Sequence, residues 1–230
     1  MDFTILLQIG GIVLVDLLLS GDNAILIALA SRNLPKKQQK QAILWGTGGA
    51  IALRIAFAFV ASMLIQIPLL KAVGGLALIW IAIKLLAGGA DEAPEHKAAE
   101  SLRLAIRTII IADAIMSLDN VLAVVALADG HLGLVILGIA ISIPFVMLSS
   151  QWLLKMIDKF PAVIYLGGAV LGYAAANMIT TDLWLKDYLY GYALGIDGLL
   201  TAFVLGVGYL LNRRRMREAE EENEQEETKI

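Results

Sequence analysis

The stretch VDLLLSGDNAILIALA, residues 15–30, is apolar enough for a membrane-spanning helix, yet it holds two acids and an amide. These residues are Asp16, Asp22 and Asn23. An acid at the bilayer centre costs about 2.5–3.5 kcal/mol on insertion scales, so such residues face the protein interior or a water-filled cavity. The stretch therefore predicts a membrane protein with a polar site inside it.

The composition of the whole chain supports the same class. Of its 230 residues, 59% are hydrophobic and 17% are charged, and the mean hydropathy is +0.77. The apolar residues form long blocks, which is typical of spanning helices. The absence of cysteine excludes disulfides and thiolate metal sites. The sequence has no basic segment with interleaved aromatic residues, so no nucleic-acid partner is predicted. The expected environment of the apolar blocks is the lipid bilayer.

Seven spans are predicted, each near the ~20 residues that a helix needs to cross the hydrocarbon core. A polar cytoplasmic linker, 89–104, separates a first three-helix unit, 1–88, from a second one, 105–180. A further helix, 181–211, and a charged cytoplasmic tail, 212–230, follow. The predicted fold class is an all-α polytopic membrane protein with spans at 5–30, 41–65, 69–88, 105–128, 132–154, 161–180 and 188–211.

The distribution of Lys and Arg predicts the orientation. With the N-terminus outside, only Lys71 and Lys186 fall on the outer side, and Arg54 lies within a span. The positive-inside rule then predicts a multi-pass protein of the plasma membrane with its C-terminus in the cytoplasm. The basic residues on the inner side are Arg32, Lys36, Lys37, Lys40, Lys84, Lys97, Arg103, Arg107, Lys155, Lys159, Arg213, Arg214, Arg215, Arg217 and Lys229.

The polar motif occurs twice. DLLLSGDN (16–23) returns as DAIMSLDN (113–120), and three predicted spans separate the copies, so they cross the membrane in opposite directions. GGAIAL (48–53) also resembles LGIAIS (137–142). These matches predict an inverted 3+3 repeat plus one C-terminal helix, a common build of secondary transporters that bind substrate near the midplane. The matched polar residues are Asp16, Ser20, Asp22 and Asn23 with Asp113, Ser117, Asp119 and Asn120.

The spacing within the first motif places most of its polar groups on one face. Residues at i, i+4 and i+7 share a helix face, which aligns Asp16 with Asn23, whereas Asp22 lies off that face. Gly21 can loosen the helix locally and turn Asp22 toward the same cavity. The second copy has Leu118 in place of this glycine, so we expect a milder distortion there.

Two such helices can present four carboxylates, two amides and two hydroxyls to one small volume. These hard oxygen donors suit Mn²⁺, Ca²⁺ or Mg²⁺ better than zinc or copper. Arg54 is expected to be a charge partner that holds one of the acids ionised. The predicted metal ligands are Asp16, Asp22, Asn23, Asp113, Asp119 and Asn120, and possible additional ligands or lining residues are Ser20, Ser117, Met116 and Asn177.

The paired SGDN and SLDN motifs, each preceded by an Asp, resemble the TerC family of integral membrane proteins, especially its short YjbE/YkoY-like branch. The resemblance covers residues 1 to 212. It implies a place in the wider superfamily that includes lysine exporters, and it implies manganese efflux. By this resemblance the residues that serve the ion are Asp16, Asp22, Asn23, Asp113, Asp119 and Asn120.

The functional hypothesis is export of a divalent cation, Mn²⁺ before Ca²⁺ or Mg²⁺, by alternating access. Carboxylates that repel one another favour protons in the empty site, and metal entry displaces those protons, which suggests metal–proton antiport. No enzyme activity or resident cofactor is predicted, and the sequence leaves protein partners open. The alternatives are an exporter of amino acids or other small solutes, a non-transport accessory protein of secretion or metal loading, and an intramembrane aspartyl protease. Against the protease, the sequence has no GxGD signature, and a catalytic pair of Asp gives the two matched Asn no role.

Overall fold

The structure is a computed structural model that describes residues 3–64, 67–88, 98–128 and 131–227. All regular elements within these ranges are helices, which confirms the predicted all-α class. They are α1 (Phe3–Leu19), α2 (Gly21–Ser31), α3 (Lys36–Leu64), α4 (Leu70–Leu86), α5 (Ala98–Leu127), α6 (Leu132–Lys159), α7 (Val163–Thr180), α8 (Lys186–Leu189) and α9 (Ala193–Glu227).

Four of these helices, α3, α6, α7 and α9, contain segments long and apolar enough to cross a membrane. Up to six spans result when the pair α1 and α2 and the two parts of a bent α5 each count as one. Helix α4 has 17 residues, about 26 Å of helix, whereas the hydrocarbon core is about 30 Å thick. The chain is therefore multi-pass by helix length and composition, and the seventh span stays a prediction.

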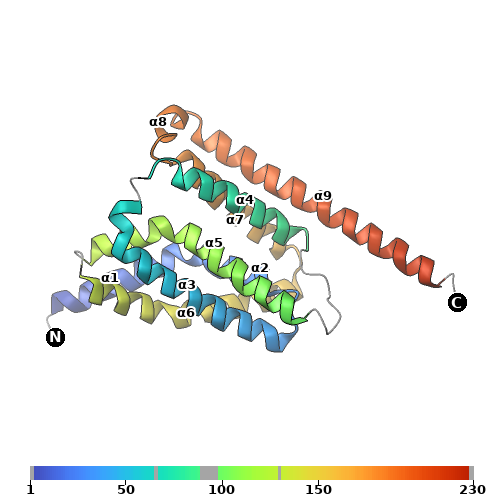
Figure 1. Ribbon diagram of the computed structural model, residues 1–230, viewed down its shortest axis with the longest axis horizontal. Helices are drawn as coiled ribbons and strands as arrows, with labels where there is room; N and C mark the ends of the chain where they lie inside the picture. Colours follow the sequence, from blue (N-terminus) through green and yellow to red (C-terminus); the bar gives the residue numbers. More distant parts are fainter. Residues whose placement is uncertain (1–2, 65–66, 89–97, 129–130, 228–230) are drawn as a thin grey trace.

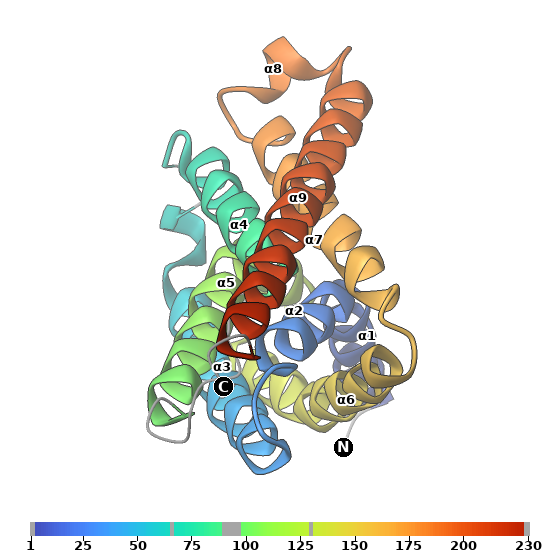
Figure 2. The ribbon, with the colours of Figure 1, turned by 90° about the vertical axis from the view of Figure 1, so that its right-hand side faces the viewer.

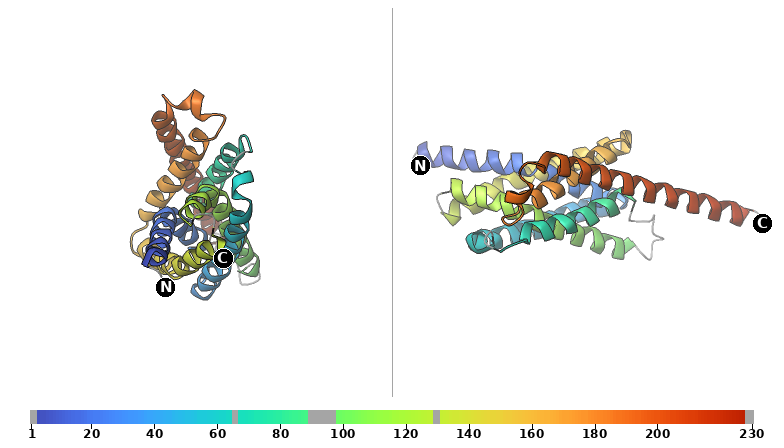
Figure 3. Two further views of the ribbon diagram at one scale, coloured as in Figure 1. Left: turned by 90° about the vertical axis from the view of Figure 1, so that its left-hand side faces the viewer. Right: turned by 90° about the horizontal axis from the view of Figure 1, so that it is seen from above.

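The long helices run along the longest axis of the molecule, and the termini lie at its opposite ends (Figure 1). Helix α3 packs on α5, and α6 packs on both α1 and α2. Helices α4, α7 and α9 contact one another and lie beside these five helices (Figure 2). The C-terminal part of α9 projects beyond the bundle (Figure 3).

Several helices extend past the apolar spans that the sequence predicted. Helix α3 begins at Lys36, just after Pro35, whose carbonyl accepts the N–H groups of Gln38 and Gln39 at 2.7 and 2.9 Å. Helices α5 and α9 likewise include polar turns of the predicted linker and tail. Hydropathy marks only the segment at lipid depth, and a helix that satisfies its own backbone groups can continue into water.

The first predicted span is broken. Helix α1 ends at Leu19, α2 begins at Gly21, and their axes differ by 47°. Helix α5 bends by 55° between its segments Glu100–Leu118 and Asn120–Leu127, so the milder distortion expected in the second copy is wrong. Ser20, between α1 and α2, has φ −102° and ψ 7°, which is open to any residue, so such a bend does not require glycine.

Close approach of α4 and α7 depends on two glycines. A β-carbon at Gly75 would lie 2.5 Å from the carbonyl oxygen of Ala175, and one at Gly168 would lie 2.5 Å from Leu86 Cδ2. Small residues at these points let the two helix backbones approach, as in other membrane helix pairs.

Candidate functional site

Arg54, on α3, lies between the first acids of the two matched motifs. Its Nη1 is 2.9 Å from Asp16 Oδ1, and its Nη2 is 2.9 Å from Asp113 Oδ1. The exposed fractions of Arg54, Asp16 and Asp113 are 6%, 0% and 4%. One buried guanidinium thus links the broken helix pair α1–α2 to α5.

Serine hydroxyls complete the hydrogen bonding of these charges. Arg54 Nη1 donates to Ser20 Oγ at 3.2 Å, and its Nε donates to Ser117 Oγ at 3.1 Å. The hydroxyl of Ser117 donates to Asp113 Oδ2 at 3.0 Å, and the hydroxyl of Ser142, on α6, donates to Asp16 Oδ2. Each Asp therefore accepts from the guanidinium and from one serine. We call this set the Arg54 cluster: Arg54, Asp16, Ser20, Asp113, Ser117 and Ser142.

The charge balance of the Arg54 cluster is incomplete. Two ionised carboxylates and one guanidinium leave one negative charge in a buried place. Burying ions costs several kcal/mol each, and pairing with further hydrogen bonds offsets that cost. With both acids ionised, the cluster attracts added positive charge.

A small cavity of about 20 Å³ adjoins the Arg54 cluster. That volume suffices for about one water-sized occupant, since a water needs ~10–15 Å³. Among its lining residues are Asn23 and Thr47, whose side-chain Nδ2, Oδ1 and Oγ1 atoms are buried without a hydrogen-bond partner in the described part of the chain. An unsatisfied buried polar group costs about 1–3 kcal/mol, so these groups favour a polar or ionic occupant.

The two motif asparagines have different surroundings. Asn120 Nδ2 donates to the carbonyl oxygen of Leu19 at 3.0 Å, at the end of α1 where an intrahelical partner is missing. The side chain of Asn23 has no such bond, although its backbone N–H donates to Asp22 Oδ1 at 2.8 Å. The side-chain amide of Asn120 is therefore held by a hydrogen bond, whereas that of Asn23 has no partner among the described residues.

Three other predicted site residues, Asp22, Met116 and Asn177, do not join the Arg54 cluster. Asp22 is half-buried and is not hydrogen-bonded to Arg54, and the side chain of Asp119 lies outside the described residues. Met116 is buried in the main apolar core, and Asn177, on α7, does not line the small cavity. Accordingly, no group of three acidic or histidine side chains that could hold a metal occurs among the described residues. The structure does not show the expected volume shared by four carboxylates.

Sequence reasoning missed two polar lining residues, Ser142 and Thr47. Ser142 is the only polar residue between positions 132 and 147, and Thr47 lies in an equally apolar block. An isolated polar side chain inside a long apolar span is the signal that could have identified both.

Two further buried acids fix helix ends away from the site. Asp182 accepts the backbone N–H groups of Ala72 and Trp184 at 3.2 and 3.0 Å, so it ties the end of α7 to α4. Asp197 accepts from Thr180 Oγ1 at 3.0 Å and joins α9 to α7. These acids have structural partners.

The sequence profile of the integral membrane protein TerC family matches residues 1–216, which include both motifs, the helices α1 to α8 and the first part of α9. The chain belongs to the TerC family. This TerC protein is 41% identical over 190 residues to the uncharacterized membrane protein YjbE of Bacillus subtilis, a match that covers 82% of this chain and 86% of YjbE.

Two other Bacillus subtilis relatives are more distant. The uncharacterized membrane protein YceF is 28% identical over 180 residues, covering 74% of this chain and 69% of the relative. The uncharacterized membrane protein YkoY is 24% identical over 210 residues, covering 81% and 65%. No solved structure matches the chain. The TerC resemblance expected from the paired motifs is thus confirmed.

Proposed function

We propose that this TerC protein exports a divalent cation, Mn²⁺ before Ca²⁺ or Mg²⁺, from the cytoplasm by alternating access. The observation that carries the proposal is the meeting of Asp16 and Asp113, the first acids of the two motifs, at one buried cation, Arg54. A buried, partly compensated carboxylate pair inside a membrane bundle is typical of an ion pathway. Carboxylate, amide and hydroxyl oxygens are ligands that Mn²⁺ accepts, and the TerC resemblance favours that ion.

Arg54 acts as an internal substitute for the transported ion. Its guanidinium lies between the two carboxylates. A divalent cation that enters beside Asn23 must draw at least one carboxylate away from Arg54. The site then exchanges one set of charge pairs for another, which avoids leaving bare carboxylates in a low-dielectric place.

Alternating access is proposed to use the inverted 3+3 repeat with α9 as the seventh span. The packing supports this, because α3 pairs with α5 as α6 pairs with α1 and α2, while α4 pairs with its repeat counterpart α7. The difference between Asn120, bonded to Leu19, and Asn23, without a bond, suits one of two exchanged states. In the other state Asn23 takes the equivalent carbonyl, that of Met116.

Proton exchange is assigned to Asp22. Arg54 already compensates Asp16 and Asp113, so they have less need of protons when the ion leaves. Asp22 lies outside the hydrogen bonds of Arg54 and accepts the N–H of Asn23. Proton antiport would therefore depend on this acid.

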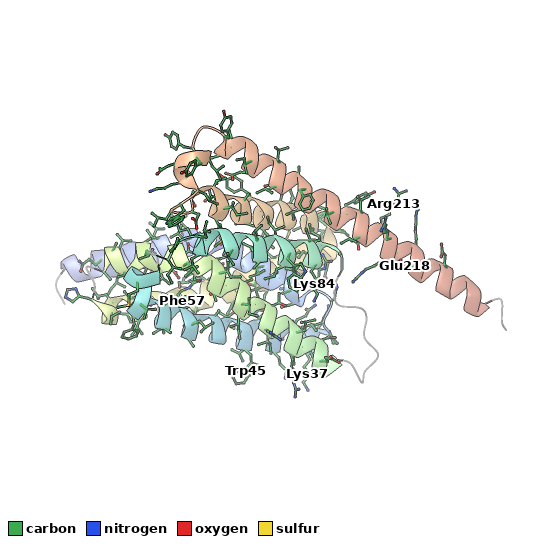
Figure 4. The ribbon with its side chains drawn as sticks, turned by 45° about the horizontal axis from the view of Figure 1, so that its top comes forward. Lys37, Trp45, Phe57, Lys84, Arg213 and Glu218 are labelled. Carbon is green, nitrogen blue, oxygen red and sulfur yellow. The ribbon has the colours of Figure 1, made fainter. Side chains whose placement is uncertain are left out.

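The proposed direction places the N-terminus outside the plasma membrane and the C-terminus in the cytoplasm. Lys37 and Lys84 lie toward the end of the bundle from which α9 projects with Arg213, whereas Phe57 lies toward the other end (Figure 4). Gathering of cations at one end supports this orientation.

The geometry disfavours two alternative functions. An amino-acid exporter needs a cation for the substrate carboxylate, but Arg54 is already bonded to Asp16 and Asp113. An aspartyl protease needs two carboxylates that share a water and a proton, and here the guanidinium lies between them.

Metal flux in sealed proteoliposomes tests the proposed function. Mn²⁺, Ca²⁺ and Mg²⁺ are compared for the wild type, Asp22→Asn and Asp119→Asn, with a pH dye inside the vesicles. We expect Mn²⁺ flux with opposite proton movement in the wild type and loss of flux in both variants. The matched control is Asp187→Asn, which changes an exposed acid outside the motifs and should transport normally.

Two results would contradict parts of this proposal. Absence of cation flux from folded wild-type protein would remove the transporter function and favour an accessory role. Mn²⁺ flux that ignores an imposed pH gradient at fixed voltage would remove the antiport step and leave export intact.

A further inference from the structure

A second, larger hollow lies between α2, α4 and α5, and none of the motif acids lines it. It has a volume of about 270 Å³ and is open to the surroundings along one side. Most of its lining is apolar. The lining residues used below are Trp80, Lys84, Leu85, Arg107 and Ile111. We call this hollow the α4–α5 groove.

The charges of the α4–α5 groove are all positive. Lys84 and Arg107 line it from the two opposite helices, and none of the described residues that line it is acidic. Arg32 adds a third cation behind the wall, since its Nη2 donates to the carbonyl oxygen of Leu85 at 3.0 Å. The groove therefore attracts an anion and repels a divalent cation, so it is not the path of the transported metal.

The apolar part of the groove is partly exposed on the outside of the bundle. Trp80 and Ile111 are 64% and 41% exposed, and each lies one helical turn from a groove cation, Lys84 and Arg107 respectively. The Nζ of Lys84 lies 5.3 Å from the ring centroid of Trp80, so the cation and the aromatic ring form one surface. An apolar channel with a basic mouth near a helix end is complementary to a charged head group with an attached acyl chain.

We propose that the α4–α5 groove binds an anionic phospholipid. The lipid phosphate lies between Lys84 and Arg107, and the first part of an acyl chain runs along Trp80 and Ile111. A free phosphate ion would use the same two cations but would leave the apolar wall uncovered, which favours the lipid. The assignment of this lipid to the cytoplasmic leaflet rests on the proposed orientation; the binding itself does not depend on metal transport.

Native mass spectrometry of the full-length protein in detergent tests this inference. Binding of phosphatidylglycerol and of phosphatidylcholine is compared for the wild type, Lys84→Gln, Arg107→Gln and the double variant. A basic residue near a lipid surface contributes enough to change affinity about fivefold, so we expect the double variant to lose about thirtyfold in phosphatidylglycerol affinity. Phosphatidylcholine binding should change little.

The matched control is the double variant Lys37→Gln with Arg213→Gln, which removes two exposed cations from the same end of the bundle outside the groove. It should bind phosphatidylglycerol like the wild type. Three results would overturn the inference: equal loss in the control, wild-type affinity in the groove variant, or displacement of the lipid by millimolar inorganic phosphate. Trp80→Ala provides an independent check, because it keeps both charges. It should lower the affinity for phosphatidylglycerol without changing the binding of inorganic phosphate.

Discussion

A guanidinium as deeply buried as that of Arg54 requires counter-charges. The sequence predicted that Arg54 would partner one motif acid, because an isolated Arg and isolated Asp residues in apolar spans need each other. It did not predict that one guanidinium bonds both Asp16 and Asp113. Residue spacing shows on which face of a helix a side chain lies. It does not show which helices pack together or how far apart they are.

Removal of this charge should be costly. Arg54→Met leaves two buried carboxylates without compensation, and we expect a loss of about 3–5 kcal/mol in the free energy of unfolding, measured by denaturation in detergent. The same substitution combined with Asp16→Asn and Asp113→Asn removes the uncompensated charges and should recover most of that loss. Equal stability of Arg54→Met and the wild type would contradict the described ion pairs.

Asn23 and Asn120 make a second test at this scale. Asn120→Ala leaves the Leu19 carbonyl without its partner and should cost about 1–3 kcal/mol of stability in thermal unfolding. Asn23→Ala removes an amide that lacks a described partner and should leave stability nearly unchanged while reducing Mn²⁺ flux. Equal destabilisation by the two substitutions would argue against their different surroundings. The repeated motif could not reveal this difference, because the two positions are identical in sequence.

At the scale of helices, the existence and order of the long elements could be predicted, but their ends and bends could not. Long apolar blocks identified the regions of α3, α6 and α7 because burial in lipid demands such blocks. The continuation of α9 to Glu227 was not predicted, since the charged tail carries no hydropathy signal. The 55° bend of α5 was underestimated because glycine was taken as its requirement.

The contact of α4 with α7 gives a prediction for a single helix pair. Gly75→Ala should destabilise the protein by about 1–3 kcal/mol, because its added carbon meets the backbone oxygen of Ala175, which cannot move aside. Gly48→Ala is the matched control, since a β-carbon there would meet nothing within 4 Å. Thermal unfolding should show the control as neutral or slightly stabilised through its better helix propensity. A similar loss in both variants would contradict the close approach at Gly75.

At the scale of the whole molecule, the number of membrane crossings decides which side each end faces. The chain contains no cysteine, so a single introduced thiol reports one position. We expect a membrane-impermeant thiol reagent to label Tyr190→Cys in intact cells and Glu218→Cys only after the membrane is opened. Labelling of both from one side would contradict the seven-span arrangement, and the cysteine-free wild type gives the background.

The family and the all-helical class could be predicted from the sequence, whereas the internal arrangement of the site could not. The paired Asp–Asn motifs led to TerC because their polar residues repeat in register within apolar segments. The described residues include no group of three acids that could hold a metal. Instead Arg54, from a third helix, lies between Asp16 and Asp113. Comparison of the two motifs concerns two helices only, whereas Arg54 lies on a third helix that the fold brings next to them.

The length of helix α9 places its acidic C-terminal end far from the bundle. It has 35 residues, about 52 Å of continuous helix. Arg213 follows its start by about 30 Å, the thickness of the hydrocarbon core, and Glu227 lies about 21 Å farther along the axis. The Debye length at physiological ionic strength is about 8 Å, so the acidic end of this rod is screened from the base of the helix. The charge of that end therefore belongs to the surrounding solution and not to the bundle.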